Sequence, residues 1–134
     1  MNKKRYLVTL LPGIILLSGC AIAWFGAGAG LGVGAYRYVQ GTLEADYSLP
    51  YDEAWEATNT ALADLYISVT NSVYEGYKGK IEAIRKDGKH VIVKLQYKSP
   101  DVTSINIRVG FFGNREDSER IHEAIRSVSE LIEQ

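Results

Sequence analysis

The sequence predicts a two-layer α+β domain, in which an antiparallel sheet of about four to five strands carries two amphipathic helices on one face. Two segments place apolar residues at steps of three and four, which is typical of helices. Shorter segments alternate apolar and polar residues, as half-buried strands do. Short turns join most successive strands, which favours antiparallel pairing. The predicted order is β-α-β-β-β-β-α.

A removable export segment is predicted before this domain. Met1 to Arg5 is short and basic, and residues 6–16 are mainly apolar, the layout of an export signal that is too short to span a membrane. Residues 17–20, Leu-Ser-Gly-Cys, resemble the lipobox of bacterial lipoprotein precursors. The resemblance implies removal of residues 1–19 and attachment of lipid, including an acyl chain such as palmitate, to Cys20. Two or more lipid chains give durable membrane attachment.

A glycine- and alanine-rich segment, residues 20–37, is predicted to link this anchor to the domain at residues 38–134. Its five glycines stand on alternate positions, Gly26, Gly28, Gly30, Gly32 and Gly34. Two interpretations remain open: a flexible tether, or a helix that lies in or partly enters the membrane through its small residues. As a helix it would reach only about 24 Å, against roughly 30 Å of hydrocarbon. No strand precedes these glycines, so a phosphate-binding loop is not expected.

The first elements of the domain are a strand and a helix. Thr42 to Tyr47 alternates Leu, Ala and Tyr with acidic residues and predicts a half-buried strand. Pro50 lies in the first turn of a helix predicted to run to about Leu65, with its apolar stripe on one side. Trp55 is the largest side chain on that stripe, so we expect it to anchor the core.

Four further strands and a second helix are predicted after this point. The strands are expected at residues 67–75, 80–85, 91–97 and 103–109. Asp87-Gly88 predicts a two-residue hairpin turn, and residues 99–101 predict another turn. Glycines bracket residues 110–113, where the sheet is expected to end. Asn114 then caps a helix whose apolar stripe comprises Ile121, Ile125, Val128 and Ile132.

Several of these motifs together resemble a known protein family. They are Tyr38-x-x-Gly41-x-Leu43, Trp55-x-Ala57-x-x-x-Ala61-Leu62, the strand after Asp87-Gly88, and Ile107-Arg108-Val109-Gly110-x-x-Gly113. The chain is similar, over most of residues 36–132, to short bacterial lipoproteins known only as a domain of unknown function. The resemblance implies an envelope lipoprotein with a small α+β domain, and it implies no activity.

No catalytic, cofactor or metal site is predicted. His90 stands on the polar side of a strand and His122 lies beside the apolar stripe of the last helix, so both are expected to be solvated. No set of His, Cys and acidic residues has metal-ligand spacing, and no hydrolase or Ser-x-x-Lys motif occurs. Without residues 1–19 the chain has 12 basic and 16 acidic residues, a net charge of −4, which does not favour nucleic-acid binding. A non-enzymatic role is therefore expected.

Positive charge is concentrated in one part of the domain. Residues 78–108 have a net charge of +5, between acidic segments on both sides. Within them Lys94 and Arg108 fall on the outward side of their strands. One interpretation is a solvated sheet face whose lysines discourage aggregation. The other is a surface for anionic lipid head groups, lipopolysaccharide or an acidic partner.

Two functions are therefore left open by the sequence. The leading hypothesis is an anchored module that binds another envelope protein through its uncovered sheet face. The alternative is a carrier of a small ligand or lipid, with a pocket between helices and sheet lined by Trp55 and its neighbours. Ala21, rather than Asp, follows Cys20. In a cell with two membranes we therefore expect the anchor in the outer membrane, with the domain in the periplasm.

Overall fold

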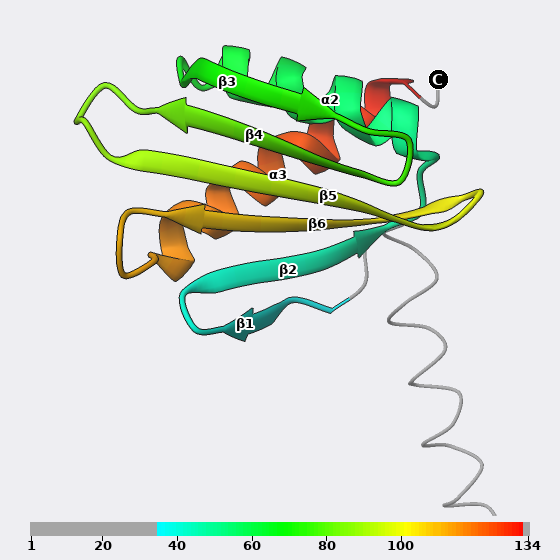
Figure 1. Cartoon of the computed structure of the whole chain (residues 1–134), viewed down its shortest axis with the longest axis horizontal. Coiled ribbons are helices and arrows are strands. Elements are labelled where there is room, and N and C mark those ends of the chain that lie inside the picture. The colour runs from blue at the N-terminus through cyan, green and yellow to red at the C-terminus, as the bar shows by residue number, and fades with distance from the viewer. Residues whose placement is uncertain (1–34, 133–134) are drawn as a thin grey trace, which may run out of the picture. The chain divides into compact units, whose positions relative to one another are not determined.

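The computed structural model describes residues 35–132, which form one antiparallel sheet of six strands with two helices on one face (Figure 1). The predicted α+β class is confirmed. The predicted signal peptide, Cys20 and the glycine-rich segment up to residue 34 lie outside the described residues. The elements are β1 (Arg37–Val39), β2 (Thr42–Tyr47), α2 (Tyr51–Asp64), β3 (Ser68–Tyr74), β4 (Lys78–Ile84), β5 (His90–Ser99), β6 (Val102–Val109) and α3 (Arg115–Ile132).

The strand order across the sheet is β1-β2-β6-β5-β4-β3. The strand β1 was not predicted, and it brings the number of strands above the four to five expected. It folds back on β2 through a turn in which Gln40 has φ 50° and Gly41 has φ 84°. Positive φ at both central residues is the two-residue hairpin geometry that Asn-Gly or Asp-Gly normally signals. Gln at the first position hid this signal.

The core lies between the sheet and the two helices. The inward rows of β2, β5 and β6 match the predicted alternation except at Tyr97, which is exposed, whereas β3 is exposed throughout. The buried apolar members of the sheet are Leu43, Ala45, Tyr47, Ile81, Ala83, Val91, Val93, Leu95, Ile105, Ile107 and Val109. Tyr47 is the largest side chain that is fully buried. Trp55 is only partly buried and packs against the border of the core, so the expectation that it is the central anchor is wrong.

The helix α2 begins one residue later than predicted, with Pro50 as its N-cap and Asp52 and Glu53 in its first turn. Acidic residues there are favoured by the positive end of the helix dipole. Tyr66 adopts a left-handed conformation (φ 58°) after the helix, and the Ile67 amide donates to the Leu62 carbonyl. This turn leaves the Leu65 side chain 39% exposed, so Leu65 does not extend the apolar stripe as expected.

The strand β4 begins at Lys78 and includes Gly79, which was predicted to belong to a turn. A Cβ atom at Gly79 would lie 2.5 Å from Cζ3 of Trp55 and 2.6 Å from the hydroxyl of Tyr51. The glycine therefore makes room for two aromatic rings of α2 beneath the strand. Packing against a neighbouring element, rather than turn geometry, explains this glycine.

The turn at Asp87-Gly88 is one residue longer than predicted. The Arg85 amide donates to the Lys89 carbonyl, and the Gly88 amide donates to the Arg85 carbonyl, both at 3.0 Å. Gly88 has φ 85°. The loop is therefore a three-residue turn that ends in a left-handed glycine, the second commonest hairpin form.

The cap predicted for the last helix is confirmed. The Asp117 amide donates to Oδ1 of Asn114 at 3.0 Å, directly before α3. The buried side of α3 is broader than the predicted apolar stripe, because Ser118, His122 and Ser129 are buried with Ile121 and Ile125. Ile132, at the end of the helix, is exposed.

Candidate functional site

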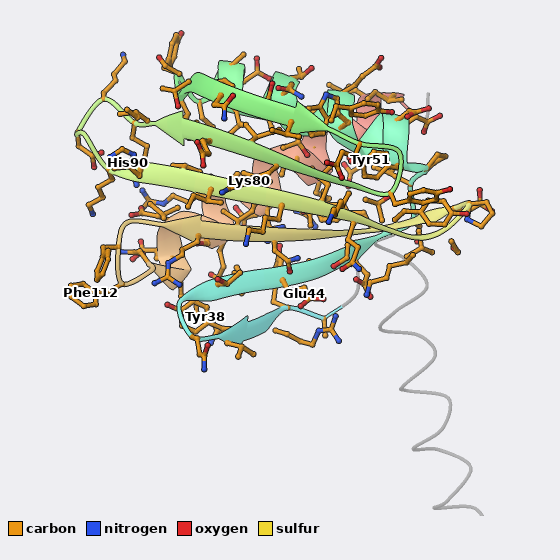
Figure 2. The ribbon with its side chains drawn as sticks, in the orientation of Figure 1. Tyr38, Glu44, Tyr51, Lys80, His90 and Phe112 are labelled. Carbon is orange, nitrogen blue, oxygen red and sulfur yellow. The ribbon has the colours of Figure 1, made fainter. Side chains whose placement is uncertain are left out.

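The face of the sheet opposite the helices is uncovered among the described residues and carries mainly polar side chains. One row crosses all six strands, because each of its members is the register partner of the next. Glu44 and Lys80 of this row are labelled on the face in Figure 2. The row runs Arg37, Glu44, Asn106, Lys94, Lys80 and Val73.

Charge is unevenly paired along this row. At the β1 end, Nη2 of Arg37 lies 2.6 Å from Oε1 of Glu44. In the middle, Lys94 and Lys80 stand directly opposite each other on β5 and β4. Lys80 has a carboxylate partner in Glu82 at 3.0 Å, and this lysine holds the pKa of Glu82 below its usual value. Lys94 has no carboxylate within 4.0 Å among the described residues.

Two shallow hollows on the open face meet at these lysines. The first has a volume of about 470 Å³ and the second about 410 Å³, and Lys80, Lys94 and Asn106 line both. Lys78 and Gln96 also line the first, and Arg108 the second. A surface with hollows and an unpaired lysine at its centre can accept carboxylate or phosphate groups from a partner.

Arg108 points outward as predicted, but the structure gives it a different use from Lys94. Its Nη1 donates to the Gln40 carbonyl at 3.0 Å, and its Nη2 donates to the Phe111 carbonyl. The guanidinium thus ties the β1–β2 turn to the turn between β6 and α3. Of the two residues predicted for an anion or partner face, only Lys94 has a head group without a hydrogen-bond or ion-pair partner within residues 35–132.

The same two turns meet through a pair of glycines. A Cβ atom on Gly113 would lie 2.2 Å from the carbonyl oxygen of Gly41, and one on Gly41 would lie 2.5 Å from the Phe112 carbonyl oxygen. The turn leaves Phe111 and Phe112 83% and 85% exposed, with their ring centroids 5.0 Å apart. Phe112 projects from the end of the sheet in Figure 2. The contacts of Arg108 and Gly113 hold the β1–β2 turn against the turn between β6 and α3, which gives these two residues of the Ile-Arg-Val-Gly-x-x-Gly motif a structural role.

The two histidines differ. His90 is exposed at the start of β5, in line with the prediction. The prediction for His122 is wrong, since this side chain is fully buried. Its Nδ1 lies 2.7 Å from the Tyr47 hydroxyl, and its Nε2 lies 2.9 Å from the Leu43 carbonyl oxygen. The imidazole therefore joins α3 to β2, and burial lowers its pKa to about 4.

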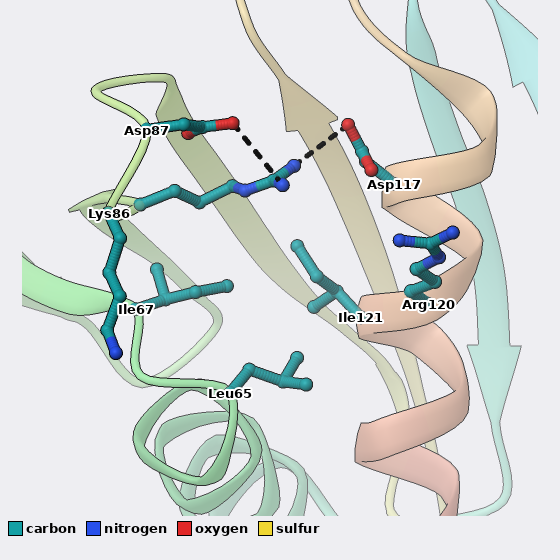
Figure 3. A pocket seen from close by; sticks show the side chains of 8 residues that line it. Leu65, Ile67, Lys86, Asp87, Asp117, Arg120 and Ile121 are labelled. Atoms are coloured by element: carbon teal, nitrogen blue, oxygen red, sulfur yellow. Dashed lines mark ion pairs between the residues drawn. The ribbon is translucent and has the colours of Figure 1, made fainter.

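A third hollow, of about 320 Å³, lies between the end of α2, the β4–β5 turn and the first turns of α3 (Figure 3). Leu65, Ile67 and Ile121 give it an apolar lining. Charged side chains complete the lining: Arg85, Lys86, Asp87, Asp117 and Arg120. Arg85 contacts Asp117 at 2.8 Å and Asp87 at 3.4 Å, the two ion pairs drawn in Figure 3.

Within residues 35–132, no group of three or more His, Cys, Asp or Glu side chains is placed to hold a metal ion. Neither α2 nor α3, the two helices that the structure describes, has the length and apolar composition needed to cross a bilayer.

Comparison with protein families gives a match over most of the chain. A family model described as "Protein of unknown function (DUF3568)" matches residues 4–128, which is most of the chain. No curated protein matches the sequence.

Proposed function

We propose a role for this chain from the premise that it belongs to this family of proteins of unknown function, DUF3568. The protein is a lipid-anchored component of the bacterial cell envelope. Its domain is a non-enzymatic module that binds an acidic surface of another envelope protein through the open face of the sheet. The anchor is Cys20, and the partner surface is centred on Lys94 and Lys80.

Support for the anchor comes from the sequence. A basic start, an apolar run and the segment Leu-Ser-Gly-Cys end at Cys20, the only cysteine in the chain. An anchored domain meets its partners at a membrane surface, so modest contact areas suffice when both proteins are held there. In a two-membraned cell, Ala21 after the cysteine favours the outer membrane and a periplasmic domain.

The observation that carries the proposed binding function is the lysine pair on the uncovered face. Like charges directly opposite each other on neighbouring strands are destabilising. Lys80 has Glu82 beside it, whereas Lys94 has no carboxylate partner among the described residues. Carboxylates from a partner would relieve the repulsion and fill the hollows on either side. The unpaired lysine therefore favours an acidic protein surface as the ligand.

Photo-crosslinking in cells tests this function. A photoreactive amino acid replaces Gln96, which lines the first hollow beside Lys94, in one variant and Glu123, which is exposed on α3, in a control. We expect a defined protein adduct from position 96 and not from position 123, with an acidic patch on the captured protein at the crosslink. Lys94→Glu in the position-96 variant should abolish the adduct. Equal capture from both positions, or adducts with lipid alone, would contradict the proposal.

A ligand carrier remains a second candidate because of the hollow beside Leu65. Its apolar lining suits the chain of an amphiphile, and Lys86 and Arg120, which remain beside the Arg85 ion pairs with Asp87 and Asp117, suit an anionic head. It ranks second because Tyr47, Leu62 and Ile105 fill the space between helices and sheet and are almost completely buried. A carrier should bind a fluorescent fatty acid, and Leu65→Glu should remove that binding. If the unaltered protein binds no fatty acid, this candidate is excluded.

A further inference from the structure

The strand β3 forms one border of the sheet, with β4 on one side only (Figure 1). All seven of its residues are exposed, including the apolar Val69, Val73 and Tyr74. An edge strand presents a row of unpaired backbone N–H and C=O groups that can pair with another strand. The opposite border, β1, has only three residues and offers a much shorter edge.

β3 lacks most of the features that normally protect such an edge. Soluble proteins usually place Lys, other charges or Pro on exposed edge strands. Each of the other five strands contains at least one charged residue, whereas β3, with the sequence Ser-Val-Thr-Asn-Ser-Val-Tyr, contains none. Its one irregularity is a shift in register between Val69 and Asn71. The longer exposed edge of the sheet is thus the uncharged one.

We propose that β3 pairs antiparallel with β3 of a second copy of this chain, which joins two sheets across a two-fold axis. An uncharged strand can meet its own copy without bringing like charges together. Pairing would satisfy the free backbone groups and cover the exposed flanks of Val69, Val73 and Tyr74. Because a two-fold axis makes the contact self-complementary, the same strand serves both copies.

The charges at the two ends of β3 favour this antiparallel arrangement. At the beginning of the strand, Nζ of Lys86 lies 4.6 Å from the ring centroid of Tyr66. At its end stand Glu75, the next residue, and Asp52, whose carboxylate accepts a hydrogen bond from the Tyr74 hydroxyl. An antiparallel pair places the beginning of each strand beside the end of the other. Lys86 of each copy then faces Glu75 and Asp52 of its partner.

This pairing goes beyond the proposed function and does not rest on it. A two-fold axis perpendicular to the sheet keeps the uncovered faces of both copies on the same side. Two Lys94 surfaces would then lie on one continuous sheet. The dimer can be tested separately, because its contacts are on the edge and the partner surface is on the face.

Cysteine crosslinking of the full chain tests the pairing, since Cys20 is the only native cysteine. Single cysteines are introduced at each position of β3, and the cells are treated with a mild oxidant. A disulfide requires the two Cα atoms to be within about 7 Å. We therefore expect a homodimer band that is strongest at one or two central positions. Val39→Cys on β1, with Val39 64% exposed, and the unaltered chain are the controls.

A charge exchange supplies an independent readout in the best crosslinking variant. Glu75→Lys and Lys86→Glu should each lower the homodimer yield severalfold, and the two changes together should restore it. Both residues are exposed, and circular dichroism checks that each variant folds. Three results would overturn the proposal: no homodimer, equal crosslinking at Val39, or crosslinks only to a protein of different mass.

Discussion

His122 shows how a single buried side chain connects distant parts of this fold. The Nε2 proton is donated to the Leu43 carbonyl, while the Tyr47 hydroxyl lies 2.7 Å from Nδ1 and 3.1 Å from the His122 carbonyl oxygen. In the neutral ring Nδ1 accepts a hydrogen bond from the Tyr47 hydroxyl. Glu119 and the Leu43 carbonyl favour the charged form, but burial has the larger effect on the pKa of His122 and lowers it. Protonation of the buried ring is therefore unfavourable in the folded protein.

Stability should consequently fall in mild acid. In the unfolded chain His122 binds a proton near its ordinary pKa of 6.5, whereas in the folded protein it does so only near 4. The loss begins as the pH drops through the unfolded value and is complete below the folded one. It amounts to about 3 kcal/mol. Urea unfolding of the protein and of His122→Gln across this range measures it. The same pH dependence in both would contradict the assignment, because carboxylates titrate in both.

The sequence could not show that His122 is buried. Periodicity counts apolar residues, and His122 follows Ile121 at a position that a narrow stripe leaves in solvent. The helix in fact buries a broader side, on which the ring finds two partners more than seventy residues away. The outward direction of Lys94 was predictable from strand alternation alone. The contacts of Arg108 were not, because they join two turns that only the fold brings together.

At the scale of elements, long periodic segments were predicted well and short or irregular ones were not. Strand β2 has the predicted bounds, because alternation extends over its whole length. Strand β1 was not predicted because three residues are too few to show an alternation of apolar and polar side chains. In addition, Gln40 is not a residue that usually indicates a two-residue hairpin turn. Gly79 was assigned to a turn, since the sequence does not reveal that Trp55 and Tyr51 pack beneath it.

Two glycines with nearly equal positive φ angles should respond very differently to an added methyl group. Gly113 has φ 81° and touches Gly41, whereas Gly88 has φ 85° and no atom within 4 Å of its Cβ position. Gly88→Ala should cost only the left-handed strain, about 1 to 2 kcal/mol. Gly113→Ala adds a backbone clash and should cost roughly 3 kcal/mol or more. Urea midpoints compare them, and equal losses would show that the two turns do not need their close contact.

At the scale of the whole molecule, the proposed anchor and the described domain depend on the sequence in different ways. The proposed export and lipid attachment depend on a local sequence pattern in residues 1–20, and recognition of that pattern needs no tertiary structure. The proposed binding of a partner by the domain depends instead on which side chains the folded sheet places next to one another. The sequence predicted an uncovered polar face, but the row from Arg37 to Val73 required the strand order and register.

Cys20→Ser should abolish lipid attachment and release the protein from the membrane. Cells grown with labelled palmitate give the measurement, followed by fractionation and separation of the two membranes by density where the cell has two. Ser18→Ala keeps a small residue before the cleavage point and should remain labelled in the outer membrane. Labelled Cys20→Ser protein in the membrane fraction would refute the anchor. Recovery of the unaltered protein with inner-membrane markers would refute the predicted location.

The pairing of β2 with β6 also determines when this domain can fold. A chain emerges from the ribosome, or from an export channel, beginning at its N-terminus, so Leu43, Ala45 and Tyr47 appear long before Ile105 and Ile107 pair with them. Contacts between such distant segments form slowly. The sheet cannot close until Val109 has been released, and α3 follows later still. A domain that must wait for its last strand stays unfolded during passage through a narrow channel, which is the state that transport across a membrane in extended form requires.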